Sequence, residues 1–239
     1  MNREEVIKKW ENGLIISCQM EKHAPCYSDD IIELMVKAAL WGGACGLRMN
    51  GVENIKTARK LTDLPIIGLV KVFRDDTEVF MTPSMKEVEM VMEAGADVIA
   101  IDGTDRLIDG KRGMDIITEI KHKYPEAIVL ADVRDEVDAD ECLKLGADMV
   151  APTFYRFKKD AKSTDLPDWE MVSRLCSVAK GRGIVLMEGK IWTPDDAIRA
   201  LHYGCHAVVV GSAITRPHLI ARRFYDHING FPEKRSLFY

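Results

Sequence analysis

Charged side chains lie at the ends of short apolar runs in this sequence. Lys71 lies in the run IIGLVKVF, whose valine and phenylalanine could desolvate its ammonium and lower its pKa toward that of a useful base. Glu188 follows four apolar residues, where a charge is costly without a partner or a purpose. We interpret Glu188 as an acid that works opposite Lys71 or as the group that neutralises it. For Lys71 the alternative is a structural ion pair with Asp102 or Asp132.

Three more polar residues follow apolar runs and are candidates for orienting a ligand. Arg48 offers a planar guanidinium fork and Gln19 an amide, both suited to an oxygen-rich molecule. Asp132 ends the run AIVLAD and could hold Lys71 or bind sugar hydroxyls. A salt bridge or a loop cap at the rim would explain Arg48 and Gln19 equally well, and an ion pair is the alternative for Asp132, so the residue types leave both interpretations open.

The stretch from Gly183 to Pro217 has the pattern of an anion site. It contains two apolar runs, each ending in a glycine turn, with Gly189 in the first turn and the pair Gly211 and Ser212 in the second. Backbone N–H groups at such turns can point at an anion, and the dipole of a following helix favours it. Arg216 could close on a phosphate there, or it could merely belong to the first turn of the last helix.

Eight apolar runs alternate with helical patterns along the chain, which is typical of an α/β fold. The intervening helices include one that we expect to be capped by Thr193 with Pro194 in its first turn. The expected strands are Gly13 to Ser17, Cys45 to Met49, Pro65 to Val72, Val98 to Asp102, Ala127 to Asp132, Met149 to Thr153, Gly183 to Glu188 and Ala207 to Gly211.

A weak repeat supports this count of strands. A glycine followed by a small residue precedes every second strand, at intervals of about fifty residues, roughly two βα units of a barrel of about 250 residues. A helix C-cap suffices to explain the glycines. We therefore predict a (β/α)8 TIM barrel that forms one domain over residues 1–239; the alternative, an open doubly wound sheet, lacks a GxGxxG motif after its first strand. The four pairs are Gly43-Ala44, Gly95-Ala96, Gly146-Ala147 and Gly204-Cys205.

Composition excludes several classes of protein. The 239 residues include 33 Lys and Arg against 38 Asp and Glu, so nothing in the charge favours nucleic acid or an anionic membrane as a partner. The six cysteines are scattered without a CxxC pair, which indicates reduced thiols in a cytoplasmic protein and no metal site. The charged N-terminus lacks the apolar segment of a signal peptide, and no run is long enough to span a membrane.

Several of these segments together resemble the N-acetylmannosamine-6-phosphate 2-epimerase family. The family resemblance implies a TIM barrel that exchanges the C2 proton of a phosphorylated amino sugar without a cofactor, and it suggests a homodimer. It implies Lys71 as general base and Glu188 as general acid. The sugar would be oriented by Gln19, Arg48 and Asp132, and the phosphate held by Gly189, Gly211, Ser212 and Arg216. The segments that carry the resemblance are GLIISCQ, GLRMNGVENIK, DLPIIGLVK, EVFMTPSMKEVEMVMEAGADVIAIDGT, ADV, MEGKIWTPDDA and AVVVGSAITRP.

The chain departs from the family pattern beside the expected site. The family usually has a small, hydroxyl-rich turn after the sixth strand, where this chain has the bulkier run APTFYRF from Ala151 to Phe157. Lys190 stands where the family commonly carries arginine, and the turn at Asp102 also differs slightly. These departures leave two other hypotheses open: an epimerase or isomerase for another phosphosugar, and a phosphosugar-binding protein without activity.

Overall fold

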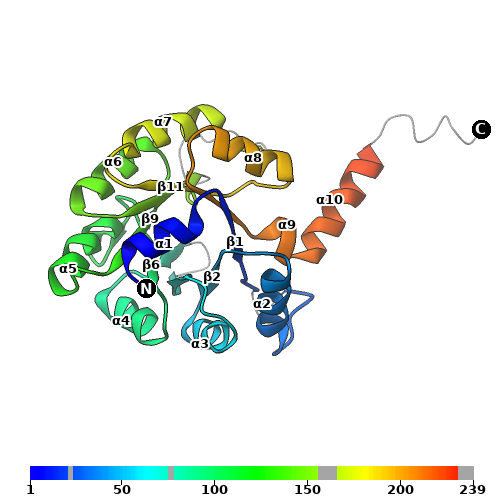
Figure 1. Ribbon diagram of the computed structural model, residues 1–239, viewed down its shortest axis with the longest axis horizontal. Helices are drawn as coiled ribbons and strands as arrows, with labels where there is room; N and C mark the ends of the chain where they lie inside the picture. Colours follow the sequence, from blue (N-terminus) through cyan, green and yellow to red (C-terminus); the bar gives the residue numbers. More distant parts are fainter. Residues whose placement is uncertain (21–23, 75–77, 156–165, 231–239) are drawn as a thin grey trace, which may run out of the picture.

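Eight parallel strands close into a barrel in the computed structural model, which describes residues 1–20, 24–74, 78–155 and 166–230 (Figure 1). Around the barrel the strands follow the order β1, β12, β11, β10, β9, β6, β3, β2. This closure confirms the predicted (β/α)8 barrel and rules out the open sheet. The strands are β1 Gly13–Ser17, β2 Gly46–Asn50, β3 Ile66–Leu69, β6 Val98–Asp102, β9 Ile128–Asp132, β10 Met149–Ala151, β11 Ile184–Glu188 and β12 Ala207–Val210.

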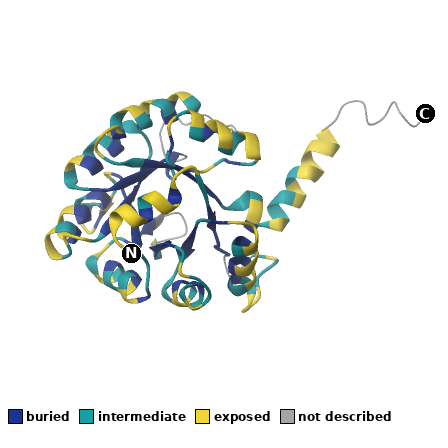
Figure 2. Ribbon diagram, in the orientation of Figure 1, coloured by how far each residue is buried: buried dark blue, intermediate teal, exposed yellow. Residues whose placement is uncertain are grey.

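Except for α10, the helices pack around the barrel with their buried faces toward it (Figure 2). Thr193 caps α8 as predicted, because its hydroxyl accepts from the N–H of Asp196 while the Asp196 carboxylate accepts from the N–H of Thr193. The helices are α1 Arg3–Trp10, α2 Ile31–Trp41, α3 Val52–Leu61, α4 Met85–Glu93, α5 Ile116–Lys123 after the 3-10 turn Gly113–Asp115, α6 Glu136–Leu145, α7 Trp169–Ala179, α8 Pro194–His202, α9 Ser212–Thr215 and α10 Pro217–Gly230.

The repeated glycines lie where helices turn into strands. Gly43, Gly95, Gly146 and Gly204 have φ angles of 84°, 99°, 107° and 100°. Residues with a Cβ rarely adopt this left-handed conformation, so glycine is the residue that ends a helix in this way. The repeat is thus a consequence of barrel geometry, as the sequence indicated.

The third strand is the largest difference from the predicted elements. The run Pro65 to Val72 was expected as one strand, but β3 ends at Leu69 and Lys71 begins an antiparallel hairpin of β4 (Lys71–Arg74) and β5 (Glu78–Met81). The chain breaks here because Val70 pairs with Thr82, whose N–H donates to the Val70 carbonyl at 2.8 Å. A second short hairpin, β7 (Leu107–Ile108) and β8 (Lys111–Arg112), follows β6.

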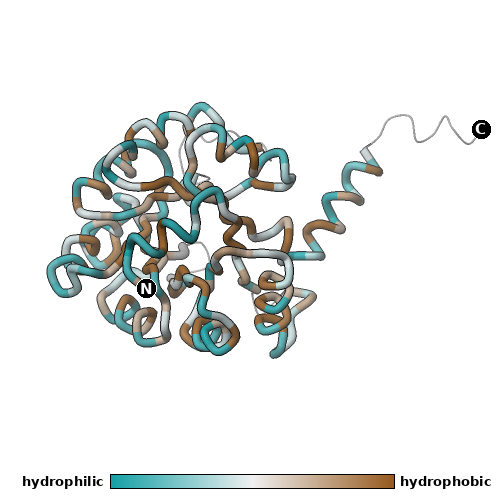
Figure 3. The backbone as a smooth tube through the Cα atoms, viewed as in Figure 1, coloured by the Kyte–Doolittle hydropathy of each residue, from teal (hydrophilic) through white to brown (hydrophobic). Residues whose placement is uncertain are grey.

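The buried hydrophobic residues form two layers, one inside the barrel and one between the strands and the helices. Figure 3 shows hydrophobic residues along the strands and on parts of the surrounding helices. Alternate residues of each strand point inward, and Trp10 of α1 is buried together with them. The outer layer needs a glycine at Gly68, since a Cβ there would lie 2.6 Å from the Ala96 Cβ and 2.7 Å from Val91 Cγ1. Gly68 therefore allows α4 to pack closely on β3.

Helix α10 projects away from the barrel (Figure 1). None of its described residues is buried, although Phe224, Tyr225 and Ile228 are large apolar side chains that are 55–66% exposed. An isolated helix of this length has little stability in water, because most helical stability comes from packing an apolar face. The exposed side chains thus leave α10 without the packing that the other long helices have.

Candidate active site

A cavity of about 430 Å³ opens at the carboxyl ends of the barrel strands. This is the end of a TIM barrel at which active sites are found. The structure brings eight of the nine predicted site residues to its lining, the exception being Asp132. The eight are Gln19, Arg48, Lys71, Glu188, Gly189, Gly211, Ser212 and Arg216.

Arg48 is the buried centre of the polar groups in the cavity, with 1% of its side chain exposed. Its Nη2 atom donates to Asp132 Oδ2 at 2.8 Å and also contacts the Met81 sulfur at 3.3 Å. Its Nη1 atom lies 2.9 Å from Glu188 Oε2, an ion pair whose angles do not make a hydrogen bond. Within the described part of the chain, Arg48 Nε, Arg48 Nη1 and Glu188 Oε2 have no hydrogen-bond partner. Buried polar atoms of this kind are suited to pairing with a polar ligand.

The carboxyl group of Glu188 is poised to exist both with and without its proton near neutral pH. Burial raises its pKa from 4.5 to about 7. The negative charge of Asp132 acts in the same direction, whereas Arg48, Lys71 and the hydroxyl of Thr153 act against it. A carboxyl group with a pKa close to the working pH is well suited to general acid–base chemistry.

Asp132 lies behind Arg48 and has no exposed surface. One oxygen accepts from Arg48 and the other from the Thr153 hydroxyl in a short hydrogen bond. The sequence left open whether this carboxylate holds Lys71, binds a sugar or forms another ion pair. The structure gives the ion pair with Arg48, so Asp132 fixes the guanidinium from outside the cavity lining.

Lys71 reaches the cavity from the start of the β4–β5 hairpin. Its N–H donates to Asn50 Oδ1 at 3.0 Å, which joins the hairpin to the end of β2. The charge of Lys71 is close enough to Glu188 to lower the pKa of that carboxyl group, against the larger effect of burial. One expectation was wrong: Phe73 is 65% exposed, so it does not shield the ammonium as its position in the run suggested.

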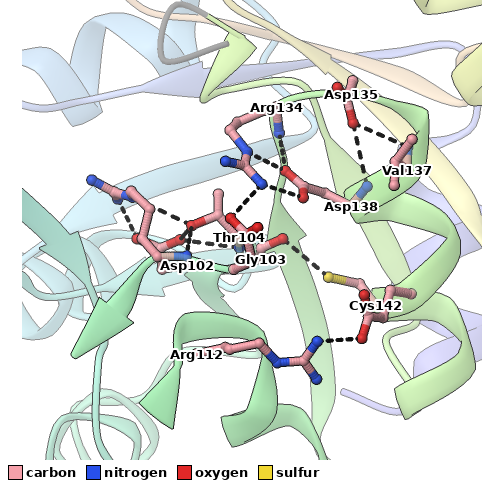
Figure 4. Close-up of polar contacts among 12 residues, drawn as sticks. Asp102, Gly103, Thr104, Arg112, Arg134, Asp135, Val137, Asp138 and Cys142 are labelled. Carbon is pink, nitrogen blue, oxygen red and sulfur yellow. Dashed lines mark hydrogen bonds and ion pairs between the residues drawn. The ribbon is translucent and has the colours of Figure 1, made fainter. Parts of the chain in front are cut away.

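Asp102, considered as a partner for Lys71, belongs to a separate polar cluster (Figure 4). It accepts from the Thr104 N–H and hydroxyl, and from Arg106. Burial raises its pKa, and Arg106 opposes this. The Arg106 guanidinium also lies 4.8 Å from the centre of the Phe80 ring and 5.0 Å from that of Phe154. This cluster connects the β5 hairpin with the turn after β10.

The predicted anion site lies in two turns that face the cavity. Gly189 has a φ angle of 100° and the next residue, Lys190, has 58°, an uncommon value for a side chain with a Cβ. Gly211 precedes α9, which has only four residues before Arg216. The helix expected after this turn is therefore short, so its dipole is weaker than predicted. Backbone N–H groups and Arg216 are the groups here that could bind an anion.

Sequence reasoning missed several residues that line the cavity. Met81 lines the cavity and contacts Arg48, and Thr153 was noted only as a strand end. The Tyr155 hydroxyl donates to Asp168 at 3.0 Å, and its ring lies 5.1 Å below the Lys190 ammonium. The apolar and aromatic character of the turn after β10 was a usable signal. The remainder of that divergent run, from Arg156 onward, lies outside the described residues.

Comparison with known families gives one match over most of the chain. Residues 32–230 match the family model described as "Putative N-acetylmannosamine-6-phosphate epimerase". Two similar relatives bear the name "Putative N-acetylmannosamine-6-phosphate 2-epimerase". The protein from Caldanaerobacter subterraneus subsp. tengcongensis is 41% identical over 94% of both chains. The one from Listeria monocytogenes serovar 1/2a is 36% identical over 97% of this chain and 98% of the relative.

Solved structures agree with the sequence comparison. The N-acetylmannosamine-6-phosphate 2-epimerase from Clostridium perfringens superposes with a TM-score of 0.85, at 34% identity, over 95% of this chain and 98% of that one. A thiamine phosphate pyrophosphorylase from Pyrococcus furiosus, at 22% identity and a TM-score of 0.59, shares the fold alone. Across the residues that the structure describes, every helix is too short or too polar to cross a membrane.

Proposed function

Because the chain belongs to the N-acetylmannosamine-6-phosphate epimerase family, we propose that it is an isomerase that interconverts N-acetylmannosamine 6-phosphate and N-acetylglucosamine 6-phosphate in the breakdown of sialic acids. The observation that carries the proposal is the position of Lys71 and Glu188 on one cavity, beside Arg48 donors that make no hydrogen bond. A pure binding site has no need of an amine and a carboxyl group poised in this way.

The proposed reaction exchanges the proton at C2, next to the carbonyl group of the open-chain sugar. Lys71 removes this proton as general base, and Glu188 supplies a proton from the opposite face as general acid. The Arg48 donors that make no hydrogen bond, Nε and Nη1, stabilise the negative charge that develops on the enolate-like intermediate. Asp132 keeps the guanidinium in place, and Gln19 orients the sugar.

The phosphate group is proposed to lie between the two glycine turns. Gly189 and Gly211 offer backbone N–H groups, Ser212 a hydroxyl, and Arg216 a guanidinium, and all four line the same cavity. Held at this end, the sugar would place its reacting carbon near the carboxyl group of Glu188. The site would then select sugars in which the phosphate and C2 are separated by the distance between the glycine turns and Glu188.

Proton NMR in deuterated water tests the activity. We expect purified protein to convert N-acetylmannosamine 6-phosphate into the N-acetylglucosamine product with deuterium entering at C2. Folded protein that shows neither conversion nor exchange would contradict the proposal. Exchange with a different phosphosugar would support the second hypothesis, which Phe154 and Tyr155 favour because they place two rings on the cavity wall.

Replacing Arg216 with alanine should raise KM for the phosphorylated substrate about tenfold or more and change kcat little, because a phosphate contact far from C2 contributes to binding in ground and transition states alike. Arg174→Ala is the matched control, since that arginine of α7 is half-exposed and pairs with Glu136 of α6. Steady-state kinetics of both variants measure KM and kcat. An unchanged KM in Arg216→Ala would remove Arg216 from the phosphate site.

We further propose that the protein is a cytoplasmic homodimer and that residues 1–239 form one domain. The projecting helix α10 supports the dimer, because its exposed apolar side chains gain packing when a second copy covers them. The free cysteines in the described chain agree with a reducing compartment.

The double substitution Phe224→Glu and Ile228→Glu should convert the dimer into a monomer, because it places two charges in the apolar contact. Analytical ultracentrifugation measures the mass of each species. Val137→Glu serves as control, since Val137 is 69% exposed on α6, which lies across the barrel from α10 (Figure 1). A wild-type protein that sediments as a monomer, or a variant that stays dimeric, would refute the role of α10.

A further inference from the structure

Thr153 bonds to Asp132 and lines the same cavity as Glu188. It follows β10 after one proline, lines the cavity, and is half-buried. Its hydroxyl donates to the buried Asp132 oxygen that Arg48 leaves free. The same hydroxyl acts on Glu188, where it opposes the effect of burial on the pKa. The bond to Asp132 is not needed to hold the strand, whose pairing with its neighbours is made by backbone groups.

A threonine hydroxyl has one proton to donate and two lone pairs with which to accept. While that proton is directed at Asp132, a protonated Glu188 can donate to the hydroxyl oxygen. When Glu188 is ionised, the hydroxyl can instead turn and donate to Glu188, because Asp132 keeps its bond from Arg48. One hydroxyl can thus serve both forms of the glutamate without movement of the backbone.

We propose that Thr153 is a positioning residue that holds Glu188 for proton transfer in both of its forms, accepting from the acid and donating to the carboxylate. The proposal rests on the proposed function, since it gives Glu188 a proton to exchange. It extends that function by a residue whose part is to keep the carboxyl group oriented while its charge changes.

The other charged groups that face Glu188 come from three different strands. Arg48 of β2 lies 2.9 Å away, Asp132 of β9 acts through its negative charge, and Lys71 of β4 acts through its positive charge. These groups remain when the hydroxyl of Thr153 is removed. A change in the pKa of Glu188 or in kcat after the hydroxyl is removed is therefore caused by the loss of the hydroxyl itself.

Thr153→Val removes the hydroxyl and keeps the shape of the side chain, whereas Thr153→Ser keeps the hydroxyl. Hydrogen bonds to an ionised group are about twice as strong as those between neutral groups, so the valine variant should destabilise the carboxylate more than the acid. We expect the pKa of Glu188 to rise by roughly one unit in the valine variant. We also expect kcat to fall about tenfold, because the proton-transfer geometry is less fixed.

Two measurements separate this proposal from the proposed function. Carbon-13 NMR of glutamate-labelled protein without substrate follows the titration of Glu188, whose signal is identified by its loss in Glu188→Gln. The pH profile of kcat then follows the reaction. A raised pKa and lowered kcat in Thr153→Val, both restored in Thr153→Ser, would support the proposal.

An unchanged Glu188 titration in the valine variant would overturn it, and so would a serine variant that behaves like valine. A changed KM with an unchanged pH profile would show that Thr153 only contacts the substrate, which also overturns the proposal. Failure of the wild-type protein to exchange the C2 proton would instead count against the proposed function, while the titration would still test Thr153.

Discussion

Lys71→Ala should lower the rate of C2 proton exchange by about a thousandfold or more, because the variant lacks the amine proposed to remove that proton. Binding of the phosphosugar should remain measurable, since the phosphate turns and Arg48 are untouched. Proton NMR in deuterated water measures exchange, and titration calorimetry measures binding. The variant should also fold, because Lys71 contributes its backbone N–H rather than its side chain to the bond with Asn50.

The control for this experiment is Lys56→Ala. Lys56 lies on α3, is half-exposed and pairs with Glu53 three residues earlier, so its loss should leave exchange unchanged. If Lys71→Ala keeps wild-type exchange, Lys71 is not the base. If the wild-type protein shows no exchange, and it and Lys71→Ala bind the sugar equally, the chain is a phosphosugar-binding protein.

Glu188→Gln should likewise lose activity by about a thousandfold, yet it should make the folded protein more stable at pH 8. The pKa of Glu188 is raised from 4.5 to about 7, chiefly by burial. Folding a carboxyl group with a raised pKa costs no free energy below pH 4.5. The cost grows between pH 4.5 and 7, where the group is ionised in the unfolded chain but keeps its proton in the folded one, and it is constant above pH 7. Above pH 7 this cost in the free energy of unfolding is about 3 kcal/mol, and the glutamine variant avoids it.

Denaturant unfolding at several pH values measures this effect. The gain in the free energy of unfolding of Glu188→Gln over wild type should be small at pH 5 and approach its maximum at pH 8. Glu53→Gln on the surface of α3 should show no such dependence, because its side chain is 82% exposed. A gain that is greatest at low pH would mean that the pKa of Glu188 is lowered in the folded protein.

The sequence predicted the barrel because each of its signals depends on local chemistry. Apolar runs of four to five residues mark strands that are buried on both faces, and Thr193 with Asp196 marks a helix start. The left-handed turn at Gly146 follows from the need to end a helix before a strand. The ends of these strands then indicated which side chains share the rim, and all but Asp132 of the nine candidates line the cavity.

The sequence could not predict partners that depend on the third dimension. The hairpin at Lys71 depends on the pairing of Val70 with Thr82, twelve residues away, which apolar periodicity does not reveal. The burial of Arg48 depends on two carboxylates from strands on other sides of the barrel. For the same reason the sequence could not distinguish Asp132 as a ligand group from Asp132 as the anchor of a guanidinium.

The pairing of the first and last strands determines when this protein can acquire its cavity during synthesis. β1 pairs with β12, from Gly13 opposite Ala207 to Ile16 opposite Val210. While the ribosome is still making the chain, one edge of β1 therefore has no partner until nearly the whole sequence has emerged. An exposed edge strand invites pairing with other chains. A nascent chain that stalls before residue 207 thus lacks the closed barrel and the Gly211 turn, and is exposed to aggregation through its first strand.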